Sequence, residues 1–450
     1  MIGITAYSAY IPRYRIRRET ITTAWGAPPV PGCKAVRNFD EDSLTMGQAA
    51  AWPLLEGAPG MAALYFASTT APYWQRSAAG LIAACCDLPA EVATADFGAS
   101  LRSGVTALRM AIEGGKAAVV VAADARDGAP ESSEELAFGD AAAAVRLGTD
   151  DVLAEVIAAG SRSDDFPDEW RRDRDAHVRS YPSKYSTARG YEANVVELAR
   201  ALLRDAGMQP AGIARAALVS PDGRAHLAAA RALGIPPERV EDPRVRDLGI
   251  TGAAMPLLML SHALDRAQSG DVILAMGYGD GAEGLLLRVH RPKPMLRADP
   301  RALEQGSYPL YRKLREFQKT DSGGPEISNV LLRREESQNV RLRGSFCPQC
   351  GTMNFPIAKI CGSCRNGGLT EKPLARKGRL FTFTTDFLYE GAVQPNVMAV
   401  VDLDGGGRFL CQMTDVEPAE VRIGLPVELV LRRMRESAGD HHYYWKCRPV

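Results

Sequence analysis

The stretch Asp96-Phe-Gly-Ala-Ser-Leu-Arg-Ser-Gly104 and its later counterpart Asp247-Leu-Gly-Ile-Thr-Gly252 decide the fold of this chain. Each stretch is followed by an apolar helix pattern, a turn with glycine, a buried strand pattern, a Gly-Asp turn and a last strand. The Gly-Asp turns are Gly139-Asp140 in the first copy and Gly279-Asp280 in the second. The shared order of elements indicates an internal duplication.

Strand and helix patterns alternate up to about residue 290, which predicts an α/β architecture with sheets covered by helices. The strand candidates are continuously apolar runs, typical of strands buried on both faces: Ala62–Ser68, Ala117–Ala123, Ala141–Leu147, Ala216–Ser220, Val272–Tyr278 and Gly284–Val289. The helix candidates are Ser43–Leu55, Ser77–Cys86, Leu101–Ile112, Ala193–Ala206, Arg224–Leu233 and Met255–Ala267.

The pattern changes after residue 290, and we expect four parts: an α/β domain over 1–290, a linker with short helices over 291–343, a zinc ribbon over 344–370 and a small barrel over 371–450. Leu310–Phe317 is a candidate short helix, and Thr320-Asp-Ser-Gly-Gly-Pro325 is typical of a linker. Beyond residue 371, five short runs alternate polar and apolar residues between Gly and Asp turns, which predicts a small antiparallel barrel.

Two CxxC pairs predict a metal site. Cys347-Pro-Gln-Cys350 and Cys361-Gly-Ser-Cys364 each place two sulfurs on one side of a tight turn. Two such turns complete a tetrahedron around zinc and leave no open position, so the site is expected to be structural. The chain has nine cysteines in all, and the other five are scattered, which is not the pattern of a disulfide framework.

The charge balance excludes one class of partner. The chain has 54 basic and 54 acidic residues, so its net charge is zero with histidine neutral. A protein that binds along the phosphates of a nucleic acid needs an excess of basic residues. We therefore do not expect this protein to bind nucleic acid. The sequence shows no targeting segment and no apolar run near the roughly 20 residues that span a bilayer, so we expect a soluble, cytoplasmic protein that does not bind membranes.

Two stretches near the N-terminus resemble the hydroxymethylglutaryl-CoA synthases of the prokaryotic type: Gly3-Ile-Thr-Ala-Tyr-Ser-Ala-Tyr-Ile-Pro-Arg-Tyr-Arg-Ile16 and Asp40-Glu-Asp-Ser-Leu-Thr-Met46. These enzymes belong to the thiolase superfamily. The tail resembles the zinc-ribbon and OB-fold domain that accompanies thiolase-like enzymes as an acyl-CoA-binding partner, with Cys411-Gln-Met-Thr-Asp415 and Ile423-Gly-Leu-Pro-Val-Glu428 among the matching segments.

The resemblance implies a duplicated thiolase-like five-layer sandwich, followed by a rubredoxin-like zinc ribbon and a small β-barrel of the OB fold. It also implies a CoA thioester or acyl-carrier substrate. A homodimer is implied as well, with its interface near Thr94–Phe97, and a complex with a thiolase-type partner is an alternative.

The resemblance also implies that the family's catalytic residues are replaced. The family uses a Glu as acid and base, a Cys as nucleophile and a His. Aligned without gaps, these positions hold Thr69, Leu101 and Val219, and an Asn of the second half becomes Leu248. Leu and Val can neither attack a thioester nor move a proton. No acyl-cysteine intermediate is therefore expected.

Three hypotheses remain open on these residues. The first is a divergent enzyme that makes or breaks a carbon–carbon bond of an acyl thioester, as an acyltransferase, a condensing enzyme or an aldolase. It would use backbone N–H groups as an oxyanion hole and draw its acid or base from Tyr73, Ser100, Asp222 or Asp280. The second is a catalytically silent subunit that binds acyl-CoA or scaffolds a thiolase-type complex. The third is a protein whose thiolase-like half only dimerises while its OB-fold half delivers the ligand. We favour the enzyme because the Gly-rich loops and the CoA-binding type of domain are both present.

Overall fold

A computed structural model describes residues 2–58, 60–173, 175–181, 183–297, 299–316, 328–388, 395–437 and 439–450. Contacts divide the chain into two units. The first comprises Met1–Arg37, Asp42–Ala83 and Ala90–Tyr311, and the second comprises Asn38–Glu41, Ala84–Pro89 and Arg312–Val450. The linker predicted at Thr320–Pro325 lies outside the described residues. Within the described ranges, no helix is long and apolar enough to cross a bilayer.

The elements up to residue 148 form the first copy of the duplication: β1 (Gly3–Tyr10), β2 (Tyr14–Arg17), α1 (Arg18–Ala24), β3 (Cys33–Val36), α2 (Ser43–Leu55), β4 (Ala63–Ala67), α3 (Ala78–Cys85), β5 (Ala93–Phe97), α4 (Ser103–Glu113), β6 (Ala118–Asp124), α5 (Ser133–Ala137) and β7 (Ala141–Gly148). The second copy and its extension follow: β8 (Ala154–Ser163), β9 (Glu169–Trp170), β10 (Arg179–Ser180), α6 (Ser183–Ser186), α7 (Ala193–Asp205), β11 (Arg215–Leu218), α8 (Ala225–Leu233), α9 (Val245–Leu248), α10 (Met255–Arg266), β12 (Val272–Tyr278), β13 (Gly281–Val289), β14 (Leu296–Arg297), β15 (Leu303–Gln305) and α11 (Tyr308–Glu316).

The strand order confirms the duplication. The first half runs β1-β7-β6-β4-β5 and the second runs β8-β13-β12-β11, so corresponding strands occupy corresponding places. In both halves the two inner strands are parallel (β4 with β6, β11 with β12), and the next pair is antiparallel. In the first half, β5 pairs with β4 in parallel. At the equivalent place of the second half, Val240 forms a parallel bridge with Ala216 of β11. The two half-sheets have the same connections, as expected if the two copies of the sequence repeat fold in the same way.

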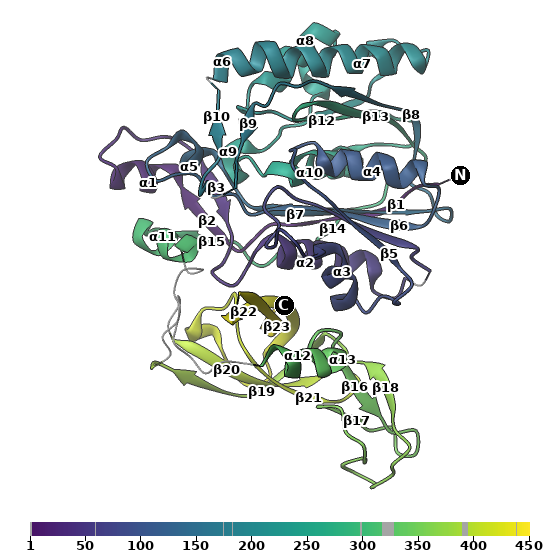
Figure 1. Ribbon diagram of the computed structural model, residues 1–450, viewed down its shortest axis with the longest axis vertical. Helices are drawn as coiled ribbons and strands as arrows, with labels where there is room; N and C mark the ends of the chain where they lie inside the picture. Colours follow the sequence, from purple (N-terminus) through teal and green to yellow (C-terminus); the bar gives the residue numbers. More distant parts are fainter. Residues whose placement is uncertain are drawn as a thin grey trace. The chain divides into compact units, whose positions relative to one another are not determined.

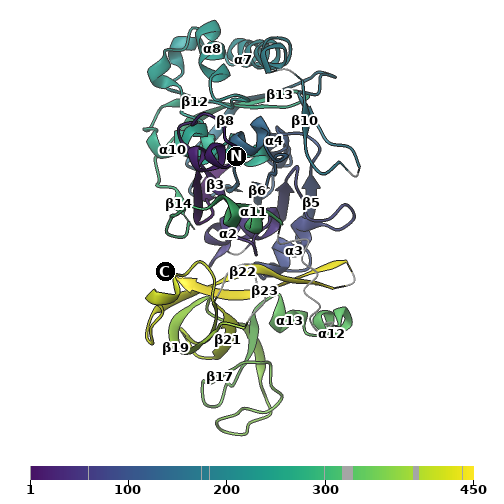
Figure 2. The same cartoon turned by 90° about the vertical axis from the view of Figure 1, so that its left-hand side faces the viewer.

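The first unit has five layers (Figures 1 and 2). Helices α7 and α8 cover the outer face of the second half-sheet, and α2 and α3 cover the outer face of the first. Helices α4 and α10 lie between the sheets and contact strands of both. The five-layer sandwich expected from the sequence is therefore confirmed. Because α10 has a sheet on each side, nearly all its side chains are buried, including Leu257 and Leu260.

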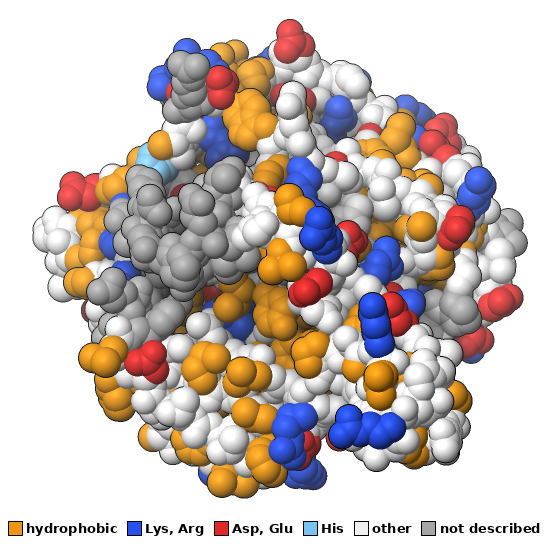
Figure 3. Space-filling view, turned by 60° about the horizontal axis from the view of Figure 1, so that its bottom comes forward, with side chains coloured by type: hydrophobic (Ala, Val, Ile, Leu, Met, Phe, Trp, Pro, Cys, Tyr) orange, Lys and Arg blue, Asp and Glu red, His pale blue; other side chains and the backbone are white. Residues whose placement is uncertain are grey.

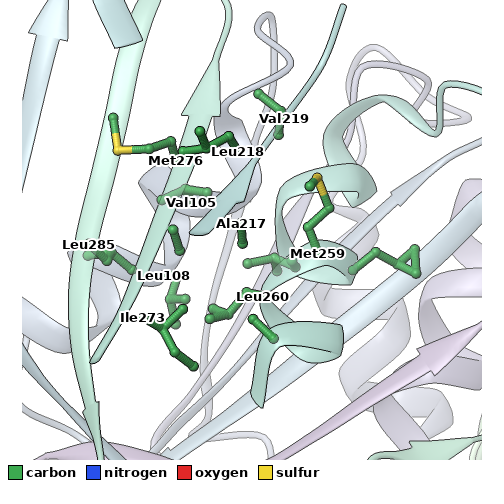
Figure 4. Packing of buried hydrophobic residues seen from close by; sticks show 14 of the residues in the cluster. Val105, Leu108, Ala217, Leu218, Val219, Met259, Leu260, Ile273, Met276 and Leu285 are labelled. Atoms are coloured by element: carbon green, nitrogen blue, oxygen red, sulfur yellow. The ribbon is translucent and has the colours of Figure 1, made fainter. Parts of the chain in front are cut away.

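The core between the second half-sheet and the middle helices is closely packed, as Figure 4 shows for side chains that point toward one another. They come from α4 and α10 on one side and from β11, β12 and β13 on the other: Val105, Leu108, Met259, Leu260, Ala217, Ile273 and Leu285. Met276 and its neighbour Leu218 lie on the other face of this sheet, toward α7. Burial of such side chains stabilises the fold by about 1.5–3 kcal/mol each. The loops at the ends of these strands thus stand on a rigid scaffold.

The second unit contains a ribbon and a barrel. Its short helices are α12 (Asn329–Arg334) and α13 (Glu336–Asn339), and its ribbon strands are β16 (Arg343–Phe346), β17 (Met353–Asn354) and β18 (Thr370–Pro373). The barrel strands are β19 (Lys377–Asp386), β20 (Asn396–Leu403), β21 (Arg408–Gln412), β22 (Pro426–Ser437) and β23 (Asp440–Pro449). They pair in the order β21-β20-β19-β22-β23, and a bridge between Met413 and Cys447 brings the ends together. The predicted barrel is confirmed.

The surface of the molecule carries mixed charges. On the face shown in Figure 3, basic and acidic side chains are interspersed, with hydrophobic side chains among them. The exposed large apolar side chains of the second unit include Phe387 and Ile423.

Candidate active site

Two adjoining cavities lie in the first unit. The large cavity has a volume of about 150 Å³ and is lined by Thr69, Thr70, Ala99, Ser100, Leu101, Arg126, Asp127, Asp168, Glu169, Trp170, Arg171, Val178, Gly279 and Asp280. The small cavity has a volume of about 40 Å³ and is lined by Leu101, Asp168, Glu169, Val219, Ser220, Pro221, Ile250, Gly252, Met255, Pro256 and Tyr278. Leu101, Asp168 and Glu169 line both.

The duplication explains where the cavities form. Thr69 follows β4, Arg126 follows β6 and Val219 follows β11, so all three stand just beyond the carboxyl ends of inner strands. Leu101 stands just before α4, and Gly279-Asp280 is the turn between β12 and β13. In open α/β sheets, ligands bind beyond the carboxyl ends of the strands. The two halves therefore direct equivalent loops into one region.

Thr69 is held by a buried carboxylate. Its backbone N–H and its hydroxyl donate to Asp124 at 2.7 and 2.8 Å. Asp124 is fully buried and also accepts hydrogen bonds from Ser68, Thr70 and the N–H of Ala253 at 2.9, 3.1 and 2.7 Å. Because five donors satisfy this carboxylate, Asp124 serves to fix the loops after β4 and β6.

Leu101 and Val219 contribute apolar surface to the cavities. The hydroxyl of Tyr191 donates to the carbonyl oxygen of Val219 at 2.6 Å. The Tyr191 ring meets the Tyr278 ring edge to face, with 5.1 Å between their centroids. These contacts fix the loop that follows β11. Neither Leu101 nor Val219 carries a group that can attack a carbonyl or transfer a proton.

Two of the four predicted acid–base candidates line the large cavity. Ser100 donates its hydroxyl to the carbonyl oxygen of Gly279 at 2.9 Å. Asp280 stands beside it, and burial raises the pKa of its carboxyl, against which the Ser100 hydroxyl and Arg102 act. The sequence placed both residues in loops near the family's pocket, and they lie together here.

The other two candidates lie elsewhere. Tyr73 is absent from the described lining of both cavities, and its hydroxyl accepts a hydrogen bond of 2.7 Å from Arg76. Asp222 is exposed and accepts from the N–H groups of Arg224 and Ala225 at the start of α8, at 2.8 Å each.

One acidic group at this site, Asp168, was not among the residues predicted from the sequence. Asp168 precedes β9 and lines both cavities. Burial raises the pKa of its carboxyl to about 6; the neighbouring Tyr278 hydroxyl opposes the shift, and the charges of Glu169 and Asp280 add to it. Glu169 forms an ion pair with Arg126. The segment is charged, so its pattern resembles a solvated loop, and no periodicity marks Asp168.

The backbone around the site is constrained. Ala99 and Asp280 line the large cavity with φ of 66° and 48°, a region that residues other than glycine seldom adopt. A Cβ on Gly190 would lie 2.1 Å from the Tyr278 hydroxyl oxygen and 2.8 Å from Asp168 Oδ1. Gly190 therefore leaves the space that these two polar groups occupy. Strained backbone of this kind is concentrated at functional sites.

No cysteine or histidine is among the described residues that line the cavities. Cys85 and Cys86 at the end of α3 are buried, and burial raises the pKa of Cys85. A thiol in such surroundings is a poor nucleophile. The carboxyl groups on the cavity walls are groups that can transfer protons.

The four cysteines of the ribbon converge. The sulfur atoms of Cys347, Cys350, Cys361 and Cys364 all lie within 4.8 Å of one another. Cys347 is 3.5 Å from Cys364, and Cys350 is 3.6 Å from Cys361. Zinc–sulfur bonds of about 2.3 Å in a tetrahedron place sulfurs about 3.8 Å apart. The cluster thus fits a tetrahedral metal with four thiolate ligands.

Comparison with known proteins agrees with both units. Residues 203–289 match the family model of the 3-oxoacyl-[acyl-carrier-protein] synthase III C terminus, and residues 371–432 match that of the ChsH2 C-terminal OB-fold domain. The hydroxymethylglutaryl-CoA synthase of Methanopyrus kandleri is 31% identical over 298 residues, covering 62% of this chain and 85% of that protein. The synthase of Pyrococcus horikoshii is 32% identical over 294 residues, covering 62% and 84%.

Solved structures show the same fold for the first unit. A hydroxymethylglutaryl-CoA synthase complexed with CoA superposes with a TM-score of 0.58 at 16% identity, covering 65% of this chain and 83% of the other. The 3-oxoacyl-[acyl-carrier-protein] synthase III of Aquifex aeolicus superposes with a TM-score of 0.55 at 22% identity, covering 64% and 100%.

Proposed function

Because the chain belongs to the hydroxymethylglutaryl-CoA synthase family, we propose that it is an enzyme that forms or cleaves a carbon–carbon bond of an acyl thioester without an acyl-cysteine intermediate. The observation that carries this proposal is the pair of cavities. Residues at the family's catalytic positions, Thr69, Leu101 and Val219, line them, and the polar groups of Ser100 and Asp280 stand on the same walls.

The chemistry would proceed by proton transfer and charge stabilisation. Ala99–Leu101 line the large cavity immediately before α4, and N–H groups at the start of a helix favour a developing negative charge. The carboxyl groups on the walls would supply an acid or base. The thioester would be carried on CoA or on an acyl carrier, and one related synthase structure is complexed with CoA.

A second candidate is a silent subunit that binds acyl-CoA. It is favoured by Leu101, which stands at the position of the family's nucleophile and lines both cavities. Such a protein would bind the thioester and scaffold an active thiolase-type partner. The two candidates differ in one measurable property, because only the enzyme changes the thioester that it binds.

The second unit would support this function in two ways. We infer that Cys347, Cys350, Cys361 and Cys364 hold one structural zinc ion, which would stabilise the ribbon and take no part in the reaction. The OB barrel would contribute to acyl-thioester binding, in keeping with the match of residues 371–432. We further place the protein in the cytoplasm.

We also infer a homodimer through β5. This strand is at the end of the sheet, and Ala93, Thr94 and Asp96 are exposed or half-buried. An exposed edge strand offers unpaired backbone groups to a second copy. Light scattering at micromolar concentration should give twice the mass of the chain, and a monomer would refute the dimer.

The experiment that tests the proposed enzyme uses acetyl-CoA and the full chain. Calorimetry should detect binding, and mass spectrometry of the intact chain should show no added acetyl group. An adduct on a cysteine would refute the proposal, and an adduct on Ser100 would favour an acyl-serine route over non-covalent chemistry. Binding without any conversion, in the presence of carbonyl compounds as acceptors, would favour the silent subunit.

A further inference from the structure

Asp168 is the one carboxyl group, apart from the arginine-paired Glu169, that lines both cavities in the described part of the chain. Both its carboxyl oxygens are buried, and Oδ1 lies next to the Tyr278 hydroxyl across the space left by Gly190. Asp280 lines only the large cavity. Asp168 is thus at the junction, where a molecule that fills both cavities must pass.

The small cavity sets the size of what it can hold. Its volume is about 40 Å³, and one water occupies roughly 10–15 Å³ in this measure, so it accommodates about three non-hydrogen atoms. Ile250, Met255 and Pro256 make one part of its wall apolar. A short acyl chain of two or three carbons fits these dimensions. The carbon next to its carbonyl would then lie at the junction.

Resting on the proposed function, we propose that Asp168 is the catalytic residue that moves the proton in an aldol-type reaction between a short-chain acyl thioester and a ketone or aldehyde. The reaction class follows from the missing nucleophile. An aldol addition joins an enolate to a carbonyl group and expels no leaving group, so the chain needs no covalent intermediate.

One proton and one electron pair move in this reaction, and Asp168 takes up and returns the proton. The Asp168 carboxylate takes a proton from the carbon next to the thioester carbonyl and becomes a carboxylic acid. The electron pair of that carbon–hydrogen bond forms the enolate, which adds to the carbonyl carbon of the acceptor. The resulting alkoxide takes the proton back from Asp168, and the product is a β-hydroxyacyl thioester. In the cleavage direction each transfer is reversed.

The neighbours of Asp168 assist this assignment. Its raised pKa, about 6, gives a base that is ionised at neutral pH yet stronger than an ordinary carboxylate. Tyr278 is a positioning residue, since its hydroxyl lies beside the carboxyl and its ring is fixed by Tyr191. Glu169, the other carboxyl group that lines both cavities, forms an ion pair with Arg126.

The first half-reaction can be tested without knowing the acceptor. The full chain is incubated with acetyl-CoA in deuterium oxide, and deuterium in the acetyl group is followed by mass spectrometry. We expect exchange with the natural chain and a loss of at least 100-fold with Asp168→Asn. The matched control is Asp165→Asn, an exposed carboxyl three residues away, which should exchange at the natural rate.

The outcomes separate this inference from the proposed function. Exchange by the natural chain that Asp168→Asn retains would overturn the role of Asp168 and leave the enzyme standing. No exchange by the natural chain despite measured acetyl-CoA binding would overturn both. Calorimetry of acetyl-CoA binding to Asp168→Asn shows whether the variant is folded. If it is not, Asp168→Glu should retain measurable but slower exchange, and a natural rate in that variant would contradict the proposal.

Discussion

Thr69 donates two hydrogen bonds, from its backbone N–H and its hydroxyl, to the two oxygens of the Asp124 carboxylate. Asp124 also accepts a hydrogen bond from Ala253, a residue of the second copy of the duplication, so it connects the loop after β4 with that copy. Thr69, which the resemblance puts at the position of the family's Glu, is therefore part of a structural network that joins the two halves.

Asp124→Ala should destabilise the first unit by about 3 kcal/mol or more. Each buried donor left without its partner costs about 1–3 kcal/mol, and Asp124 accepts from five. Thr69→Ala removes one side-chain bond and should cost about 1 kcal/mol. Urea unfolding of both variants measures the difference. Equal losses in the two variants would show that the network is not centred on Asp124.

The rate of acetyl-CoA exchange should depend on the ionisation of Asp168. The base form exists above its pKa of about 6, so the rate should rise as the pH increases through 6 and then level off. Asp168→Asn should remove this limb of the profile. A profile of unchanged shape in a slower variant would assign the limb to another group.

The Asp168 carboxyl should also make the stability of the folded chain depend on pH. This stability should fall as the pH rises, whereas the exchange rate should increase. The pKa of this carboxyl is raised from an ordinary value of about 4 to about 6 in the folded chain, so the folded state binds the proton more tightly than the unfolded state. The stabilising contribution is therefore complete below pH 4 and lost as the pH rises through 6. Asp168→Asn should gain stability relative to the natural chain at pH 8 but not at pH 4. Thermal unfolding at both values measures this.

Freshly purified protein should contain about one zinc ion per chain. Cys347→Ser should lose the metal and expose the second unit to proteolysis first, because metal binding stabilises a ribbon that has a small core of its own. Cys33→Ser is the matched control, since Cys33 is a half-buried thiol outside the cluster. Elemental analysis and limited proteolysis decide the question, and a metal-free protein with a protease-resistant ribbon would contradict it.

A buried charge cluster in the second unit should be costly to break. Arg432 is fully buried and forms ion pairs with Asp40, Glu41 and Asp415 at 3.4, 3.2 and 2.6 Å. Arg432→Met would remove one positive charge from three buried carboxylates, of which Asp40 would keep its ion pair with Lys446 and Asp415 its ion pair with Arg448, and should cost about 3–5 kcal/mol.

Arg408→Met is the control for that cluster, because the pair of Arg408 with Asp402 is about half exposed and should contribute less than about 1 kcal/mol. Guanidinium unfolding followed by Trp fluorescence compares the two variants. Similar small losses in both would mean that the cluster contributes no more than a surface pair.

Local patterns in the sequence are sufficient to predict most of the helices and strands, the duplication and the cysteine cluster. Helix Ser43–Leu55 and strand Val272–Tyr278 have the bounds that their patterns predict, because hydrogen bonding and burial repeat at fixed local spacings. The cysteines converge because each CxxC turn fixes two ligands locally. The replacement of the family's catalytic residues at Thr69, Leu101 and Val219 stays a prediction from the order of residues.

Which polar side chains line the cavities depends on the tertiary packing and cannot be predicted from local sequence patterns. Asp168 and Tyr278 are 110 positions apart, and no period links them. Asp222 and Tyr73 looked equally suitable in sequence, yet one caps α8 and the other binds Arg76. Likewise, Arg432 forms an ion pair with Asp40, which lies near the other end of the sequence. Contacts between residues far apart in the sequence depend on how the sheets and loops pack. The burial that raises the pKa of Asp168 exists only after this packing has formed.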